Sequence, residues 1–161
     1  MRESMPWRFG QKLRYLRARS SLTQAALALR LHLASHAHIS SLETSRFAPS
    51  LDVIIAVADL FAVRVEYLVR EELPPQAADE QQYQRGSREG LGVRFFGPNL
   101  ARLRVQAGLT QVQLAEQLDL AAHAHVSFLE SGRKQPSVEL ILRAAALFGV
   151  TSDQLLSDST Q

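Results

Sequence analysis

Apolar residues recur at helical spacing along the second half of the chain. They fall three and four positions apart in residues 100–107, 114–118, 126–129 and 140–148, and a last pair stands at 155–156. This spacing places apolar side chains on one face of an α-helix, whereas a half-buried strand would alternate apolar and polar residues. No such alternation is present, so the pattern predicts five short helices.

Capping residues mark the ends of these helices. Thr110 precedes the second helix, and Gln113, three residues later, completes a capping box. Ser137 and Thr151 stand as N-caps before the fourth and fifth helices. Glycines that can close a helix in the left-handed conformation follow the first, third and fourth helices: Gly108, Gly132 and Gly149.

The first half of the chain repeats this pattern. With an offset of 87 positions (96 − 9), residues 9–69 align with residues 96–156 without a gap. A repeating unit of about sixty residues has the size of a small helical domain. The alignment predicts five helices in the first copy, at residues 9–19, 24–31, 36–44, 51–61 and 65–69.

We therefore predict an all-α protein with two tandem five-helix domains, one at residues 1–70 and one at residues 95–161. The segment between them, residues 71–94, carries Pro74, Pro75 and three glycines and has almost no apolar stripe. This composition is typical of a flexible polar linker.

The two copies differ in the residues that follow their helices. Ser21, Ser45 and Ala62 in the first copy stand where the second copy has glycine. A residue with a side chain costs roughly 1 kcal/mol in the left-handed conformation. Either the first copy ends its helices differently, or it is the less stable half.

Composition excludes several classes of protein. The 161 residues include no cysteine, so we expect neither disulfides nor thiolate chemistry. No apolar run approaches the roughly 18 residues of a membrane helix, and the first ten residues lack the apolar stretch of a signal peptide. No phosphate loop, nucleophile–base arrangement or pair of catalytic carboxylates stands out, so we expect no enzyme and no cofactor. A cytoplasmic, nucleoid-associated protein without membrane contact fits this composition.

The net charge of +2 is unevenly distributed. Residues 1–70 carry a net +5 (10 − 5), residues 71–95 a net −2 (3 − 5) and residues 96–161 a net −1 (5 − 6). Non-specific affinity for DNA comes mainly from neutralising phosphates. Charge therefore favours the first copy as the stronger DNA binder, through basic residues around its first two helices: Arg8, Lys12, Arg14, Arg17, Arg19 and Arg30.

Three short motifs occur in both copies at matching positions. Leu-Thr-Gln ends at Gln24 and at Gln111, a Leu-Glu pair ends the third helix at Glu43 and at Glu130, and Pro-Ser precedes the fourth helix. With these motifs, each copy resembles the lambda-repressor-like (Cro/cI) helix-turn-helix family. The resemblance implies that the second helix of each copy lies across the DNA backbone and that the third enters the major groove.

The resemblance also implies roles for particular residues. Gln24 and Gln111 would contact phosphate at the start of the second helix, where free backbone amides already favour an anion. Arg17 would pair with Glu43, and Arg104 with Glu130, as structural ion pairs. Residues that would reach base edges are His36, Ala37, Ser40 and Ser41 in the first copy, and His123, Ala124, Ser127 and Phe128 in the second.

Both copies carry one more residue in the turn before the third helix than the family pattern has. The start of the third helix therefore shifts by about one residue, which adds Ser35, His38 and His125 to the candidates for DNA contact. Arg46, Arg133 and Lys134 follow the third helices, where backbone phosphate would lie.

The two His-Ala-His tripeptides allow three interpretations. Imidazole can donate to a phosphate or to a guanine acceptor, or it can bond carbonyls of the local turn. Metal binding is less favoured, because residues i and i+2 of a helix point to different sides and one tripeptide cannot chelate well. For Phe128 there are two interpretations. It could contact a thymine methyl group, or it could belong to a protein interface that no longer reads DNA.

These observations favour a sequence-specific transcriptional regulator, most simply a repressor, that uses two tandem heads on paired half-sites of double-stranded DNA. The alternative is an antitoxin-like or partner-binding regulator in which one copy binds DNA and the other mediates dimerisation. A homodimer is compatible with both hypotheses.

Overall fold

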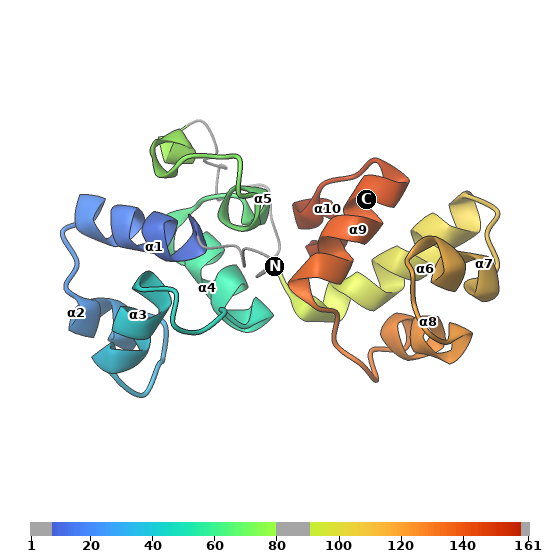
Figure 1. The fold of residues 1–161 in the computed structure, drawn as a ribbon, viewed down its shortest axis with the longest axis horizontal. Coiled ribbons are helices and arrows are strands. Elements are labelled where there is room, and N and C mark those ends of the chain that lie inside the picture. The colour runs from blue at the N-terminus through green and yellow to red at the C-terminus, as the bar shows by residue number, and fades with distance from the viewer. Residues whose placement is uncertain (1–7, 80–90, 159–161) are drawn as a thin grey trace. The chain divides into compact units, whose positions relative to one another are not determined.

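The computed structural model describes residues 8–79 and 91–158, which belong to two compact units, residues 1–86 and residues 87–161. Within the described residues there are ten α-helices, five in each unit, and no strand longer than a single bridge (Figure 1). The prediction of an all-α protein built from two five-helix domains is confirmed.

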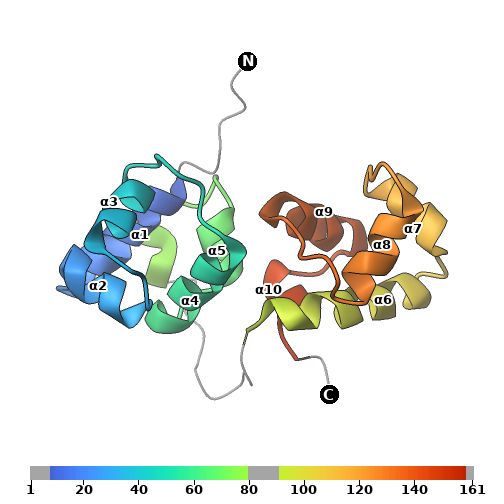
Figure 2. The same ribbon diagram turned by 90° about the horizontal axis from the view of Figure 1, so that it is seen from below.

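The first unit contains α1 (Arg8–Arg19), α2 (Gln24–Arg30), α3 (His36–Glu43), α4 (Leu51–Phe61) and α5 (Val65–Val69). Helices α2 and α3 lie side by side, and α1 packs against both α3 and α5 (Figures 1 and 2). Every helix contributes apolar residues to the core, including these, one from each helix and all at most 2% exposed: Leu13, Leu27, Ile39, Ile54 and Leu68.

The second unit contains α6 (Phe96–Gln106), α7 (Gln111–Gln117), α8 (His123–Glu130), α9 (Val138–Phe148) and α10 (Ser152–Leu156). A short 3-10 helix, η3 (Val93–Phe95), leads into α6. The packing of the second unit repeats that of the first: α7 lies against α8, and α6 contacts both α8 and α10. The core residues stand at the corresponding positions: Leu100, Leu114, Val126, Ile141 and Leu155.

The predicted N-caps are confirmed. The Thr110 hydroxyl accepts from the amide of Gln113, whose side chain accepts from the Thr110 amide, and Thr151 and Gln154 form the same capping box. Ser137 caps α9 through the amide of Leu140. Each helix therefore begins where its sequence signal stands, because the hydroxyl satisfies a backbone amide that the helix leaves unpaired.

The first unit ends its helices in the same left-handed conformation as the second, without glycine. The φ angles of Ser21, Ser45 and Ala62 are 54°, 55° and 51°, compared with 69°, 72° and 63° for the three glycines of the second unit. The sequence left two possibilities: the first copy ends its helices in another conformation, or it is the less stable half. The first possibility is excluded, because the helix ends have the same left-handed conformation in both units. The first unit adopts the strained backbone at three positions where the second unit has glycine.

Gly10 and Gly97 let the first helix of each unit approach the end of the third. A Cβ atom on Gly10 would lie 2.8 Å from the carbonyl oxygen of Glu43, and one on Gly97 would lie 2.7 Å from that of Glu130. Backbone at this distance cannot accommodate a methyl group without moving. In the first unit, the close approach of α1 and α3 accompanies the pairing of Arg17 with Glu43. In the second, that of α6 and α8 accompanies the pairing of Arg104 with Glu130.

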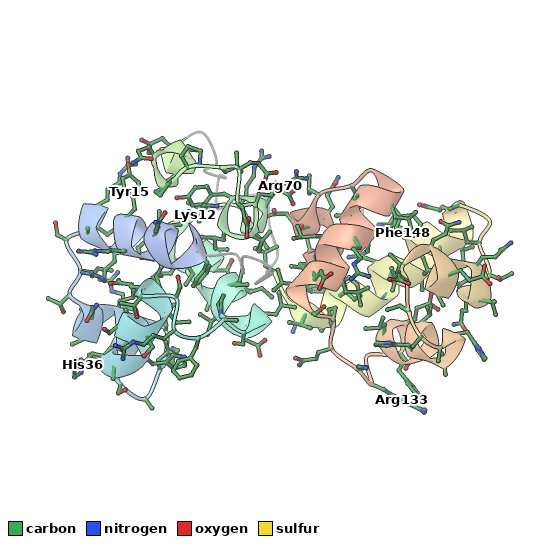
Figure 3. The ribbon with its side chains drawn as sticks, in the orientation of Figure 1. Lys12, Tyr15, His36, Arg70, Arg133 and Phe148 are labelled. Carbon is green, nitrogen blue, oxygen red and sulfur yellow. The ribbon has the colours of Figure 1, made fainter. Side chains whose placement is uncertain are left out.

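Lys12 is completely buried, with 0% of its surface exposed. Its ammonium donates to the main-chain carbonyls of Tyr67 and Arg70, the latter at 2.5 Å, and lies 4.9 Å from the centre of the Tyr67 ring. Figure 3 shows Lys12 reaching from α1 toward the end of α5. The expectation that Lys12 adds to a basic DNA-binding surface is therefore wrong: its charge satisfies the carbonyls that end α5.

Asn99 occupies the position of Lys12 in the second unit and performs the same task with an amide. Its Nδ2 atom donates to the carbonyls of Gln154, Leu155 and Ser157 at 3.2, 3.0 and 2.9 Å. Two chemically different side chains thus connect the first helix to the last helix in the two units.

Both described ends of the segment expected to be a linker are folded against their units. The 3-10 helix η1 (Pro75–Asp79) packs on α1: Ala78 is 1% exposed, the Tyr67 hydroxyl donates to the Pro75 carbonyl at 2.7 Å, and Arg19 pairs with Asp79 at 2.5 Å. At the other end, Leu91 is buried and the amide of Gly92 donates to the Leu156 carbonyl at 2.8 Å. The remainder of the expected linker, residues 80–90, lies outside the described residues.

Candidate nucleic-acid interface

Helices α2 and α3, and likewise α7 and α8, form a helix–turn–helix in each unit. The turn begins with a left-handed residue, His32 at φ 54° and Asp119 at φ 52°. The following helix begins at His36 in one unit and at His123 in the other, so the longer turn gives both units the same register. Ser35 and Ala122 occupy the N-cap positions, and neither makes a side-chain cap hydrogen bond.

The buried residues of α3 fix which side chains face outward. Ile39 and Leu42 are at most 1% exposed. With about 100° of rotation per residue, Ala37, Ser40 and Ser41 lie on the opposite side, and His36 and His38 lie on the two flanks. Both histidines and Ala37 are exposed, and the two serines are half-buried. Figure 3 shows His36 at the start of α3.

Helix α8 presents the corresponding residues in the same way. Val126 and Leu129 are buried, and Ala124, Ser127 and Phe128 face outward. Phe128 keeps 43% of its surface exposed. His123 is exposed and His125 is half-buried on the flanks of the helix. The outward faces of α3 and α8 are thus the candidate base-reading surfaces, and we call α3 and α8 the reading helices.

A network of side chains holds each reading helix in place. In the first unit, Arg17 donates to both carboxylate oxygens of Glu43, from Nε at 2.5 Å and from Nη2 at 3.0 Å, and donates from Nη1 to the Leu22 carbonyl at 3.0 Å. The hydrogen bond to Glu43 raises the pKa of the Arg17 guanidinium above its ordinary value. Gln24 donates from Nε2 to Glu43 Oε2 at 2.9 Å. Side chains of α1 and α2 therefore meet at one carboxylate at the end of α3, and Arg17 also holds the turn that precedes α2.

The same network recurs in the second unit. Arg104 donates to Glu130 at 2.6 and 3.2 Å and to the Leu109 carbonyl at 2.9 Å. Gln111 donates to Glu130 Oε2 at 2.8 Å. These are the two arginine–glutamate pairs that the resemblance implied.

The part played by the glutamine was missed by sequence reasoning, which assigned Gln24 and Gln111 to phosphate alone. In the structure, one N–H of each amide is directed to the glutamate that closes the reading helix. A primary amide has a second N–H, so phosphate contact stays a prediction. The signal that could have revealed the bond is the spacing of 19 residues between glutamine and glutamate, which both copies share.

Basic residues follow each reading helix. Arg46, Arg133 and Lys134 are all exposed, and Figure 3 shows Arg133 extending away from its unit. The backbone folds back on the helix here, because the amide of Arg46 donates to the Ser41 carbonyl at 2.9 Å and that of Lys134 to the Phe128 carbonyl at 3.1 Å. Their contact with phosphate stays a prediction.

The charge difference between the units is smaller at the surface than the sequence indicates. Lys12 is buried, Arg17 pairs with Glu43 and Arg19 pairs with Asp79. The side chain of Arg8 lies outside the described residues. Among the described residues of the expected basic cluster on the first two helices, Arg14 and Arg30 are exposed, and Arg19 is exposed but paired with Asp79.

Among residues 8–79 and 91–158, no three histidine, cysteine, aspartate or glutamate side chains are grouped closely enough to hold a metal ion. Over the same residues, none of the helices has the length and apolar character needed to cross a bilayer.

The geometry defines a class, the tandem helix-turn-helix proteins, and comparison with known families agrees. The model of the helix-turn-helix domain family matches this chain twice, at residues 8–70 and at residues 96–157. The chain belongs to this family and contains its domain in two copies.

Two curated relatives are similar to part of the chain. The HTH-type transcriptional activator BcrR of Enterococcus faecalis is 44% identical over 62 residues, which are 38% of this chain and 30% of the relative. The HTH-type transcriptional regulator PrpR of Mycobacterium tuberculosis is 38% identical over 65 residues, 40% of this chain and 13% of the relative. The chain thus matches less than a third of either relative's length. No solved structure matches the chain.

Proposed function

We propose that this protein is a sequence-specific transcriptional regulator that binds double-stranded DNA with both of its helix-turn-helix units. The observation that carries the proposal is the repetition of one reading surface. Helices α3 and α8 present the same His-Ala-His start and a following serine, and an equivalent Arg–Glu–Gln network fixes each helix. The two named relatives, a transcriptional activator and a transcriptional regulator, support this function.

The proposed target is a pair of related half-sites. Adjacent major grooves on one face of DNA are about 34 Å apart. Twelve Cα–Cα steps separate Asp79 from Leu91 (91 − 79), and an extended chain covers at most about 43 Å over that length. This connection is long enough for two heads to bind neighbouring grooves. Joining the heads raises affinity, because binding of the first fixes the second at high local concentration.

Selection of bound DNA from a random pool with the full chain tests this proposal. We expect two half-sites of related sequence at a fixed separation, and footprinting should protect both. Cleavage at a protease site inserted within residues 80–90 should weaken binding strongly while both units stay folded. Equal affinity of the cut and intact forms would contradict the two-headed mode, and failure to select any sequence would contradict specific DNA binding.

Repression is the outcome we propose, since a protein that occupies two neighbouring grooves of a promoter excludes polymerase from that stretch. A reporter gene placed behind the selected site measures the sign directly. Loss of expression on adding the protein is expected, and a gain would instead make it an activator.

The charge of the second unit favours a second candidate, in which this unit pairs with another protein. Residues 96–161 carry a net −1, compared with +5 for residues 1–70, and a negative charge opposes contact with phosphate. Gel shifts with each isolated unit separate the two candidates. DNA binding by both units supports the two-headed reader, whereas binding by the first unit alone supports the pairing role.

A further inference from the structure

The two reading helices differ at one outward position. Their sequences, His36–Glu43 and His123–Glu130, agree at six of eight residues. One difference, Ile39 against Val126, is buried in both units and cannot touch DNA. The other, Ser41 against Phe128, faces outward. Ser35 and Ala122 also differ, but they precede the helices as N-caps. Within the helices, any difference in the bases that are read therefore arises at this position.

The surroundings of Phe128 fit a polyanion better than an apolar partner. Ser127 precedes it on the exposed face, and Ala124 lies one turn before it. The amide of Lys134 donates to the Phe128 carbonyl at 3.1 Å, and the side chains of Lys134 and of the preceding Arg133 are exposed. A large apolar side chain among hydroxyl groups and cations matches the major groove, where a thymine methyl group lies between base edges and flanking phosphates.

We propose that Phe128 is a specificity-determining residue that makes the second unit require the 5-methyl group of thymine at one base pair. The thymine methyl is the one apolar group on the major-groove edge of the four bases, and phenylalanine packs against it. Ser41, at the same place in the first unit, offers a hydroxyl that donates to or accepts from any base edge. The DNA target then consists of two half-sites of the same sequence, except at the one base pair that faces Phe128 in one half-site and Ser41 in the other.

This inference rests on the proposed function, and its test is arranged so that the two can fail separately. Selection from a random pool with the unaltered chain is done first; if no sequence is enriched, the proposed function itself fails. If sites are enriched, selection is repeated with Phe128→Ser and with Ser41→Phe. We expect half-sites that differ at one position for the unaltered chain. Phe128→Ser should relax the thymine requirement in one half-site, and Ser41→Phe should create it in the other.

A second measurement removes only the methyl group. Deoxyuridine replaces thymidine at the identified position of the selected duplex. We expect the unaltered chain to lose about fourfold in affinity, as for one buried methyl-sized group, and Phe128→Ser to lose nothing. Neither Phe128 nor Ser41 is among the buried residues of the core, so circular dichroism should show both variants folded.

Three outcomes overturn the inference while leaving DNA binding intact. The first is selected sequences that do not change in either variant. The second is an equal effect of deoxyuridine on the unaltered chain and on Phe128→Ser. The third is that Phe128→Ser changes self-association, measured by analytical ultracentrifugation, without changing the selected sequence.

Discussion

Arg104 and Glu130, 26 residues apart in the chain, are joined by two parallel hydrogen bonds of 2.6 and 3.2 Å. Their side chains are only 16% and 10% exposed, and the hydrogen bond that Arg104 donates to Glu130 raises the pKa of the Arg104 guanidinium above its ordinary value. The pair connects α6 to the last residue of α8. Glu130 also accepts from Gln111, so one carboxylate fixes both helices of the DNA-binding motif.

Glu130→Ala should destabilise the second unit by about 2–3 kcal/mol, because it leaves a half-buried guanidinium without its partner. The exposed pair of Arg143 and Glu139 provides a matched control within the same unit, since these side chains are 42% and 72% exposed. Glu139→Ala should cost no more than about 0.5 kcal/mol. Calorimetric unfolding of the full chain measures both variants. Equal losses for the two would show that the buried network does not stabilise the unit.

Much of the fold could be predicted from local signals. Thr110, Ser137 and Thr151 act within one helical turn, so their positions in the sequence alone determine where helices begin. Helical spacing of apolar residues identified the faces of α3 and α8 that are buried, and therefore the faces that are exposed. The arginine–glutamate pairs were also reached, though through the resemblance and not through spacing.

What could not be predicted depends on contacts between residues far apart in the sequence. Lys12 looks like any surface lysine until the carbonyls of Tyr67 and Arg70, 55 and 58 residues away, are found beside it. Likewise, Pro75–Asp79 has the composition of a linker, but Ala78 and the carbonyl of Pro75 provide the contacts that hold it on the first unit. Counting charges along the sequence overestimated the basic surface for the same reason.

Ala62 and Gly149 provide a test of the strained helix ends, because they occupy equivalent positions with left-handed backbone. Ala62→Gly should stabilise the first unit, and Gly149→Ala should destabilise the second, each by about 1 kcal/mol. A Cβ atom on Gly149 would meet nothing within 4 Å, so its effect reports backbone conformation and not a steric clash. Calorimetry should show the melting transitions of the two units moving in opposite directions. If Ala62→Gly lowers stability, strain at this position is not what distinguishes the units.

Lys12 and Arg46 should respond differently to salt. Lys12→Met leaves two carbonyls unpaired, which should cost the first unit about 1–3 kcal/mol, but it should not change how DNA affinity depends on salt. Arg46→Ala should leave stability nearly unchanged and reduce the slope of log affinity against log salt by about 0.9, the value for one lost phosphate contact. Titrations at several salt concentrations separate the two effects. A reduced slope in Lys12→Met would place its charge at the DNA, contrary to its burial.

The exposed histidines at the start of the reading helices should contribute to DNA affinity through their ring nitrogens. His36 and His123 stand at the first position of α3 and of α8. If they donate to phosphate or to guanine, each substitution His36→Ala or His123→Ala should weaken DNA binding roughly fivefold, as expected for the loss of one hydrogen bond. His32→Asn is the control, because His32 lies in the turn and has Asp119 as its counterpart, and it should bind like the unaltered chain. Titrations with the selected duplex measure all three variants. Unchanged affinity for His36→Ala and His123→Ala would leave the interpretation in which the histidines bond local carbonyls.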